Sequence, residues 1–366
     1  MHAFRRGIGL ISRTWTINIY SSYRMRSCAV CGEEVSMATS SISSSGVSCE
    51  EDPPVMTENI LVDSMPTRII KVGGEISKTK DGVISPKVLF LVIPGNPGVP
   101  EFYEVFCQTL YKASGYTIPA WAVSHAGHSE VPHSIQEKLR ATDRDDEIYN
   151  LQQQIEHKMA FIEDCIPPGV KLILIGHSVG CYIIVDLIRR MPKLNLLRAV
   201  LLFPTVEHIW DTPNGRTIGN MVVYLRWAAV ALSHIGYYLS DWVKWRLIQW
   251  WFKGRKIPDC AFHAIQQLTD PARIHNSMYM AATEMEEILD ADVSTIQDHL
   301  EKFTMYYGSK DNWAPRSHYE SMRRRFPEGD IRLCRRGMQH AFCLDSSELM
   351  ADMVWNWMSS SIQEVQ

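Results

Sequence analysis

The chain has 366 residues, of which 46% are hydrophobic and 21% charged, and its formal net charge is −4 at pH 7. It can therefore bury a large core and fits one large α/β domain with an insertion, while the negative charge argues against nucleic acid as the main partner. Its nine cysteines are odd in number and lack the spacing of a disulfide framework, so we interpret them as reduced thiols of an intracellular protein.

Residues 1–55 differ from the rest, and we predict a flexible or targeting extension before a folded domain of residues 56–366. The first 32 residues contain arginine but no acidic residue, a composition typical of a mitochondrial transit peptide. An upstream extension of a shorter protein that starts at Met37 or Met56 explains the segment equally well. Cys28 and Cys31 lack the second pair that a structural zinc site needs, and a serine-rich tether follows them.

The folded domain is predicted to begin with a hairpin and a buried strand. Alternating apolar residues predict strands over residues 60–62 and 67–72, with Gly73–Gly74 as the turn. The apolar run Val88–Ile93 predicts a strand covered on both faces, which ends in the turn Pro94–Gly98. The glycines of this turn leave backbone N–H groups exposed, although an ordinary Pro-Gly turn is the alternative.

The next stretch predicts a helix over residues 102–111, a strand over 118–123 and a helix over 147–161. His125 and His128 follow the strand and raise the question of a metal site. No further ligands lie at suitable spacing, so we expect a loop at the mouth of a pocket.

A nucleophile is predicted at Gly176-His-Ser-Val-Gly180, because this G-x-S-x-G sequence joins an apolar strand, Leu172–Gly176, to an apolar-periodic helix. Such a turn is too tight for side chains at the two glycines and pushes the serine hydroxyl out above the sheet. Ser178 is therefore the candidate nucleophile.

Residues 207–300, after a strand predicted over 197–203, interrupt the alternation of strands and helices and suit a helical lid over the pocket. Breaks at Arg226, His234 and Asp241 argue against a transmembrane helix. Aromatic and basic residues interleaved with Leu and Ile favour contact with a lipid–water interface, although the apolar underside of a soluble lid is the alternative. The candidate lipid-contacting residues are Trp227, Trp242, Trp245, Trp250 and Trp251.

A serine nucleophile needs a base, an acid that orients the base, and an anion hole. Asp311 follows an apolar strand that begins at Lys302, and His340 lies in a loop after a short strand over 329–334, so these residues are the candidate acid and base. Glu207 and Asp211 are alternative acids. The chain order Ser, acid, His indicates an α/β-hydrolase fold with a mostly parallel sheet, in which the backbone N–H groups of Asn96 and Val179 would bind the oxyanion.

Several short sequences together resemble the lipid droplet-associated hydrolase family over about residues 57–358. They are Ile93–Gly98, Ser124–His128, Gln154–Lys158, Ile175–Gly180, Leu202–Thr205, Tyr307–Asp311, Phe326–Cys334 and His340–Phe342. The resemblance implies a serine esterase at the surface of lipid droplets and the endoplasmic reticulum, acting on cholesteryl esters and other neutral lipids. It also assigns the nucleophile, acid and base to Ser178, Asp311 and His340.

The expected reaction is ester hydrolysis through an acyl-enzyme, without a metal or cofactor. The alternative is a lipid droplet-binding protein that turns over substrate weakly or not at all, because a complete triad does not decide what reaches it.

Overall fold

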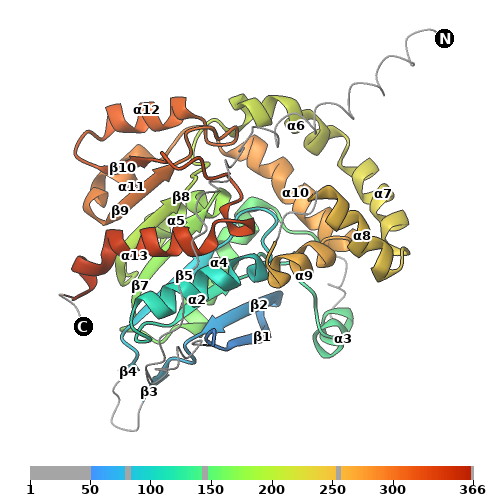
Figure 1. The fold of residues 1–366 in the computed structure, drawn as a ribbon, viewed down its shortest axis with the longest axis horizontal. Coiled ribbons are helices and arrows are strands. Elements are labelled where there is room, and N and C mark those ends of the chain that lie inside the picture. Colours follow the sequence, from blue (N-terminus) through green and yellow to red (C-terminus); the bar gives the residue numbers. More distant parts are fainter. Residues whose placement is uncertain (1–50, 79–83, 142–146, 253–256, 364–366) are drawn as a thin grey trace, which may run out of the picture. The chain divides into compact units, whose positions relative to one another are not determined.

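The structure is a computed structural model that describes residues 51–78, 84–141, 147–252 and 257–363, and a sheet of eight strands lies at its centre (Figure 1). The strands of this sheet are β1 (Val55–Val62), β2 (Met65–Val72), β5 (Val88–Ile93), β6 (Ala120–Val123), β7 (Lys171–His177), β8 (Leu196–Leu202), β9 (Phe303–Tyr307) and β10 (Asp330–Leu333). Their order is β1-β2-β6-β5-β7-β8-β9-β10, and β3 (Ser77–Lys78) and β4 (Ile84–Ser85) form a separate small pair. From β6 to β10 every neighbouring pair is parallel, while β1 and β2 are antiparallel at one edge.

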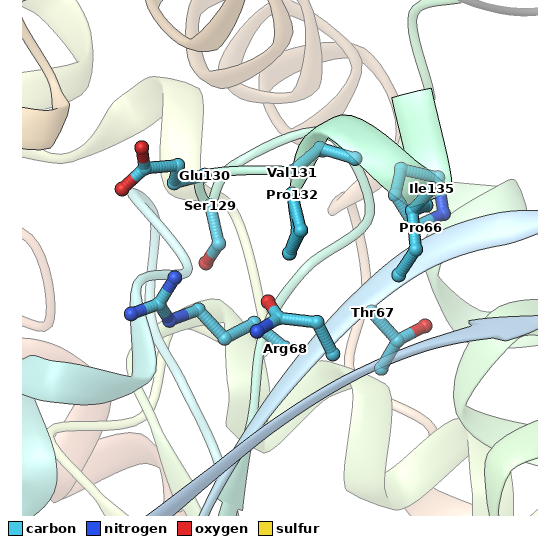
Figure 2. Close-up of a pocket in the computed structure, with 9 residues that line it drawn as sticks. Pro66, Thr67, Arg68, Ser129, Glu130, Val131, Pro132 and Ile135 are labelled. Carbon is cyan, nitrogen blue, oxygen red and sulfur yellow. The ribbon is translucent and has the colours of Figure 1, made fainter. Parts of the chain in front are cut away.

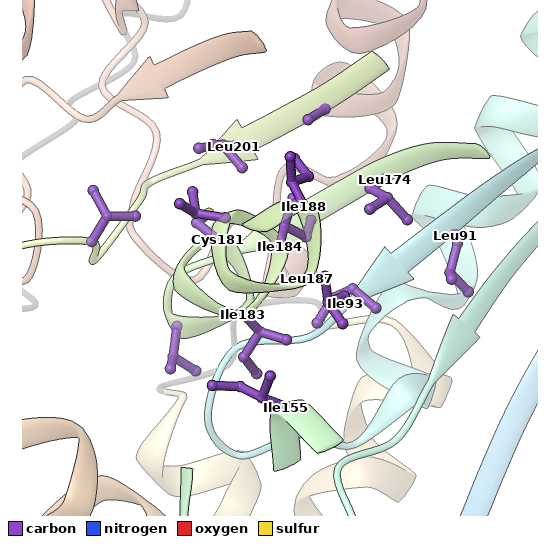
Figure 3. Packing of buried hydrophobic residues seen from close by; sticks show 14 of the residues in the cluster. Leu91, Ile93, Ile155, Leu174, Cys181, Ile183, Ile184, Leu187, Ile188 and Leu201 are labelled. Atoms are coloured by element: carbon purple, nitrogen blue, oxygen red, sulfur yellow. The ribbon is translucent and has the colours of Figure 1, made fainter. Parts of the chain in front are cut away.

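Helices cover both faces of the sheet, as the unbroken apolar sequence of β5 predicts. Leu89, Leu91 and Ile93 point to one face, where α4 (Leu151–Cys165) and α5 (Val179–Arg190) pack. The intervening side chains of β5 point to α2 (Glu104–Ala113) and α13 (Ser347–Gln363) on the other face. Figure 3 shows the apolar side of α5 against the sheet. The arrangement is the predicted α/β-hydrolase fold.

Among the described residues, five α-helices lie between β8 and α11 (Val293–Asp298), in the predicted insertion (Figure 1). They are α6 (Pro213–Tyr224), α7 (Arg226–Tyr237), α8 (Asp241–Trp251), α9 (Asp259–Gln267) and α10 (Pro271–Glu287). The long helix α10 packs against α6, α7 and α4. In the described residues no single helix reaches the length and apolarity of a membrane span, whereas α6 and α7 together do, with a bend of 77° between them.

The structure corrects several sequence-based expectations. The turn of the first hairpin is Asp63–Ser64, both with positive φ, and not Gly73–Gly74, which follow the second strand. Asp in the left-handed region forms this turn without glycine, which is why the glycine pair misled the prediction. The helix expected to begin at Glu147 begins at Leu151, because Asn150 caps it. Helices α3 (His133–Ala141) and α12 (Arg316–Arg325) were not predicted.

Residues 1–50 lie outside the described residues, and with them the tether and the Cys28–Cys31 pair. The six cysteines in the part that the structure describes are free thiols.

Candidate active site

The candidate nucleophile stands at the C-terminal end of β7, where the chain turns into α5 with Ser178 at a φ of 54°. A Cβ on Gly180 would lie 2.2 Å from the backbone oxygen of Ile93, and one on Gly176 would lie 2.8 Å from the backbone nitrogen of Cys181. Only glycine fits at these two positions. The positive φ is the strained conformation expected of a nucleophile in this turn.

Ser178, His340 and Asp311 form one chain of hydrogen bonds, although each follows a different strand. The Nε2 atom of His340 lies 2.9 Å from the Ser178 Oγ, and its Nδ1 lies 2.6 Å from an Asp311 carboxylate oxygen. The carboxylate can only accept, so Nδ1 carries the proton and Nε2 is free to accept the serine proton. This is the arrangement in which an imidazole can act as a base toward the serine.

Asp311 is held as a buried carboxylate. Burial alone would raise the pKa of Asp311, but His340 and the backbone N–H groups of Trp313 and Ala314 outweigh it, so this pKa is lowered. The two N–H groups donate to the second carboxylate oxygen over 2.7 and 3.1 Å. The candidate acid therefore stays ionised and fixed in orientation.

The two alternative acids are engaged elsewhere. Glu207 is buried and forms an ion pair with Arg325 over 2.7 Å, and Asp211 lies 3.6 Å from Arg216. Among the described residues the carboxylate bonded to His340 is that of Asp311.

We call the turn Pro94–Gly98 the oxyanion turn. It contacts the turn that carries Ser178, since a Cβ on Gly95 would lie 3.1 Å from the Ser178 Cβ. Within the described residues the backbone N–H groups of Asn96 and Val179 have no protein acceptor. The side-chain Nδ2 of Asn96, by contrast, donates to the backbone oxygen of Ser277 and to the Glu284 carboxyl, over 2.9 and 2.8 Å. Helix α10 thus fixes the turn from outside the sheet.

Glu284 is an unusual partner, because it is a buried carboxyl on α10. Burial raises the pKa of Glu284 to about 8, and the hydrogen bond from Asn96 lowers it only in part. The side chain is therefore mostly protonated at neutral pH.

The two histidines of the loop after β6 are buried. His128 accepts the backbone N–H of Gly98 over 2.9 Å, and a Cβ on Gly98 would lie 2.2 Å from the His125 ring. The two rings pack behind the oxyanion turn. No cluster of three or more His, Cys, Asp or Glu side chains suited to a metal ion is found among the described residues.

Two further residues of the site, His177 and Tyr103, were not predicted from the sequence. The ring of His177, next to the nucleophile, bonds to the backbone oxygen of His340 over 2.9 Å and to the hydroxyl of Tyr103 over 2.7 Å. The histidine within the G-x-S-x-G sequence was the available signal for the first, whereas Tyr103 belongs to no motif.

The sequence model of the family described as lipid-droplet associated hydrolase matches residues 86–343. The chain belongs to the lipid droplet-associated hydrolase family. The human lipid droplet-associated hydrolase is 37% identical over 318 residues, which cover 83% of this chain and 95% of the relative. The Drosophila melanogaster protein of that name is 32% identical over 80% of this chain and 94% of its own length.

Solved structures of hydrolases are similar in fold to this member of the family. A putative lipase from Acinetobacter baumannii matches with a TM-score of 0.58 and 11% identity, over 85% of this chain and 93% of that one. An archaeal carboxylesterase from Nitrososphaera gargenis matches with a TM-score of 0.55 and 13% identity, over 85% and 100%. At such identities the likeness shows the fold alone.

The five candidate lipid-contacting tryptophans of this family member are all exposed on α7 and α8. Trp250 is 72% exposed, Trp242 69% and Trp227 68%. Helix α7 has the opposite burial pattern to an ordinary surface helix. Its buried residue is the polar Ser233, while the apolar Leu232 and Ile235 are exposed. An exposed apolar surface of this kind marks a contact with a partner or a lipid phase.

A separate small pocket lies between β2 and the start of α3, with Arg68 facing Ser129 and Glu130 (Figure 2). It has room for roughly one water molecule. None of its lining residues belongs to the candidate active site.

Proposed function

We propose that this chain is a serine hydrolase that cleaves carboxylic esters of neutral lipids, cholesteryl esters first among them, at a lipid droplet surface. The observation that carries the proposal is the hydrogen-bonded chain from Ser178 through His340 to Asp311, placed at the carboxyl edge of an α/β-hydrolase sheet. Membership of the lipid droplet-associated hydrolase family supports the lipid substrate.

Acylation begins when the Ser178 Oγ attacks the ester carbonyl carbon. The serine proton passes to the Nε2 of His340, while Asp311 stabilises the imidazolium through the Nδ1 hydrogen bond. The backbone N–H groups of Asn96 and Val179 bind the oxyanion, and losing one such donor costs about 3 kcal/mol of barrier. The carbon–oxygen bond to the alcohol then breaks, and the alcohol leaves with the proton from His340.

Deacylation repeats these steps with water. His340 takes a proton from water as its oxygen attacks the acyl carbon of the Ser178 ester. The second intermediate collapses, Ser178 recovers its proton from His340, and the fatty acid is released.

The exposed surface of α6, α7 and α8 supports action at a lipid surface. We propose that its tryptophans insert into the droplet or endoplasmic reticulum monolayer, and that these helices serve as a lid beside the site. Arg246 stacks on Trp242 and Lys244 on Tyr237, with the cations 5.9 and 5.6 Å from the ring centroids. Paired aromatic and basic side chains suit the headgroup region.

Purified protein and its Ser178→Ala variant test the function on emulsified cholesteryl ester, emulsified triacylglycerol and short soluble esters. We expect turnover of one lipid class, lost in Ser178→Ala together with labelling by a fluorophosphonate probe. Labelling of Ser178→Ala at the wild-type rate would show that the nucleophile is assigned wrongly.

The second candidate function is droplet binding with weak or no turnover, and the exposed tryptophans favour it. In that case wild-type protein binds emulsions but hydrolyses none of the three ester classes, and Ser178→Ala leaves the cellular effect on lipid storage unchanged.

A further inference from the structure

Two buried side chains connect the base to the oxyanion turn. His177 ends β7, and Tyr103 ends the 3-10 helix η1 (Pro100–Tyr103). The Nε2 of His177 lies 2.9 Å from the backbone oxygen of His340, and its Nδ1 lies 2.7 Å from the Tyr103 hydroxyl. That hydroxyl lies 2.9 Å from the backbone nitrogen of Gly95. Two side chains thus join three segments of the site.

The chemistry of these groups fixes the direction of each hydrogen bond. A backbone carbonyl only accepts, so Nε2 of His177 carries the proton and donates to His340. Nδ1 of the neutral ring is then an acceptor, and the Tyr103 hydroxyl donates to it. The hydroxyl oxygen in turn accepts the Gly95 N–H. A single tautomer of neutral His177 satisfies all three bonds.

The surroundings of His177 keep the ring neutral. Aromatic rings of Tyr103, Phe203 and Phe342 pack around it, with centroids 5.9, 6.3 and 5.0 Å away. Burial, with a smaller contribution from His340, lowers the pKa of His177 to about 3. At neutral pH the ring therefore keeps one donor and one acceptor.

The base needs such support because His340 lies in the loop between β10 and the 3-10 helix η4 (Phe342–Leu344), whereas Ser178 lies at the end of a central strand. A misplacement of the reacting groups by about 1 Å can cost about a hundredfold in rate. His177 ties the backbone of that loop to the strand that carries the nucleophile.

We propose that His177 and Tyr103 are positioning residues, which hold the backbone of His340 and the oxyanion turn at fixed places around Ser178. The inference rests on the proposed function, because it assigns these residues to the same Ser178 chemistry. Among the described residues, neither side chain forms a hydrogen bond with the Ser178 Oγ or the ring of His340.

The test is the rate at which a fluorophosphonate labels Ser178 in the full-length protein. Tyr103→Phe removes one hydroxyl, and we expect labelling to slow by about tenfold, because the buried Gly95 N–H loses its acceptor and the Nδ1 of His177 loses its donor. Tyr307→Phe is the matched control, since in the described residues the buried Tyr307 hydroxyl has no hydrogen-bond partner. It should label at the wild-type rate.

Substitutions at residue 177 separate positioning from packing. The amide of His177→Gln can donate to His340 and accept from Tyr103, while His177→Phe keeps an aromatic ring without either group. We expect His177→Gln to label about tenfold faster than His177→Phe. A packing role predicts the reverse order.

All variants are compared at a temperature where circular dichroism shows them folded. Absence of labelling in the wild-type protein would contradict the proposed function itself. If the wild type is labelled but Tyr103→Phe matches Tyr307→Phe, or His177→Phe labels as fast as His177→Gln, the positioning role is wrong. If the variants at residue 177 do not fold, the comparison of Tyr103→Phe with Tyr307→Phe tests the positioning role by itself.

Discussion

At the scale of single residues, the site depends on which carboxylate faces His340. Asp311 is bonded to the Nδ1 of His340 over 2.6 Å, while Glu207 is neutralised by Arg325 over 2.7 Å. Both carboxylates are buried, so burial does not distinguish them. They are distinguished by their partners, a histidine for Asp311 and an arginine for Glu207.

We therefore expect Asp311→Asn to lower activity and Glu207→Gln to lower stability. An amide at residue 311 favours the wrong imidazole tautomer, and kcat should fall by about 10³ to 10⁴-fold. Glu207→Gln leaves His340 untouched, so kcat should stay within about threefold, while the free energy of unfolding falls because Arg325 loses its buried partner. Steady-state kinetics and thermal melts of both variants measure this. A large loss of kcat in Glu207→Gln, with kcat unchanged in Asp311→Asn, would show that Glu207 and not Asp311 orients His340.

The sequence offered Ser178 and Asp311 as candidates because each belongs to a local pattern: the G-x-S-x-G turn between a strand and a helix for Ser178, and the end of a strand for Asp311. It did not predict the contacts of His177 with Tyr103, or of Asn96 with Glu284. These pairs lie far apart in sequence, and side-chain direction and donor pattern become visible only in the folded chain.

At the scale of elements, the junction of β5, β7 and α5 sets the position of the candidate nucleophile. Helix α5 begins directly over the end of β5, with Gly180 against the backbone oxygens of Ile93 and Pro94. This close approach places Ser178 and the oxyanion turn side by side.

A Gly→Ala substitution at residue 180 tests this packing, and the same substitution at residue 236 is its control. In Gly180→Ala the added Cβ would lie 2.2 Å from the Ile93 oxygen, so the strand or helix must shift, at a cost of about 3 kcal/mol or more. In Gly236→Ala, on α7, the Cβ meets no atom within 4 Å, and higher helix propensity should stabilise the protein by about 0.5–1 kcal/mol. Urea unfolding compares the two. Equal midpoints for both variants would contradict the tight contact.

Helix α10 carries a pH-dependent contribution to stability. The pKa of Glu284 is about 8 in the folded protein and 4.5 ordinarily, so between these values the folded chain holds a proton that the unfolded chain has released. The free energy of unfolding therefore falls as pH rises through this range. Glu284→Gln keeps an acceptor for Asn96 and removes the proton uptake.

We expect Glu284→Gln to melt higher than the wild type at pH 9, by on the order of 5 °C, and to differ little at pH 5. Glu286→Gln, at an exposed position of the same helix, is the control and should show no such difference. Melting curves at the two pH values decide between these expectations. A constant offset between Glu284→Gln and the wild type at both would mean that residue 284 is not a buried acid.

Elements with strong local patterns were predicted well and those defined by context were not. The apolar runs of β5 and β7 predict buried parallel strands, because only a sheet covered on both faces hides every side chain. The turn at Asp63–Ser64 was missed because side chains other than glycine can adopt its positive φ. Helix α12 carries few apolar residues, and Met322 is its buried one, so its periodicity is weak.

At the scale of the whole molecule, apolar surface is distributed unevenly. Most of the large exposed apolar side chains of the described residues lie between Tyr224 and Trp251, and the rest are scattered. Burying such surface in a lipid phase stabilises binding by roughly 25 cal/mol per Å². None of these exposed side chains belongs to the core clusters on either face of the sheet that holds Ser178, so we expect binding and chemistry to be separable by mutation.

Replacing Trp227, Trp242 and Trp250 together by Gln tests this separation. We expect binding to triolein emulsions coated with phosphatidylcholine, measured by flotation, to fall by about tenfold or more. Hydrolysis of a short soluble ester should stay at the wild-type rate, because the triad is untouched. Leu289→Gln with Val293→Gln, which removes exposed apolar side chains outside α6–α8, is the control and should bind normally. Equal losses in both variants would show general surface stickiness, and unchanged binding in the tryptophan variant would place the docking surface elsewhere.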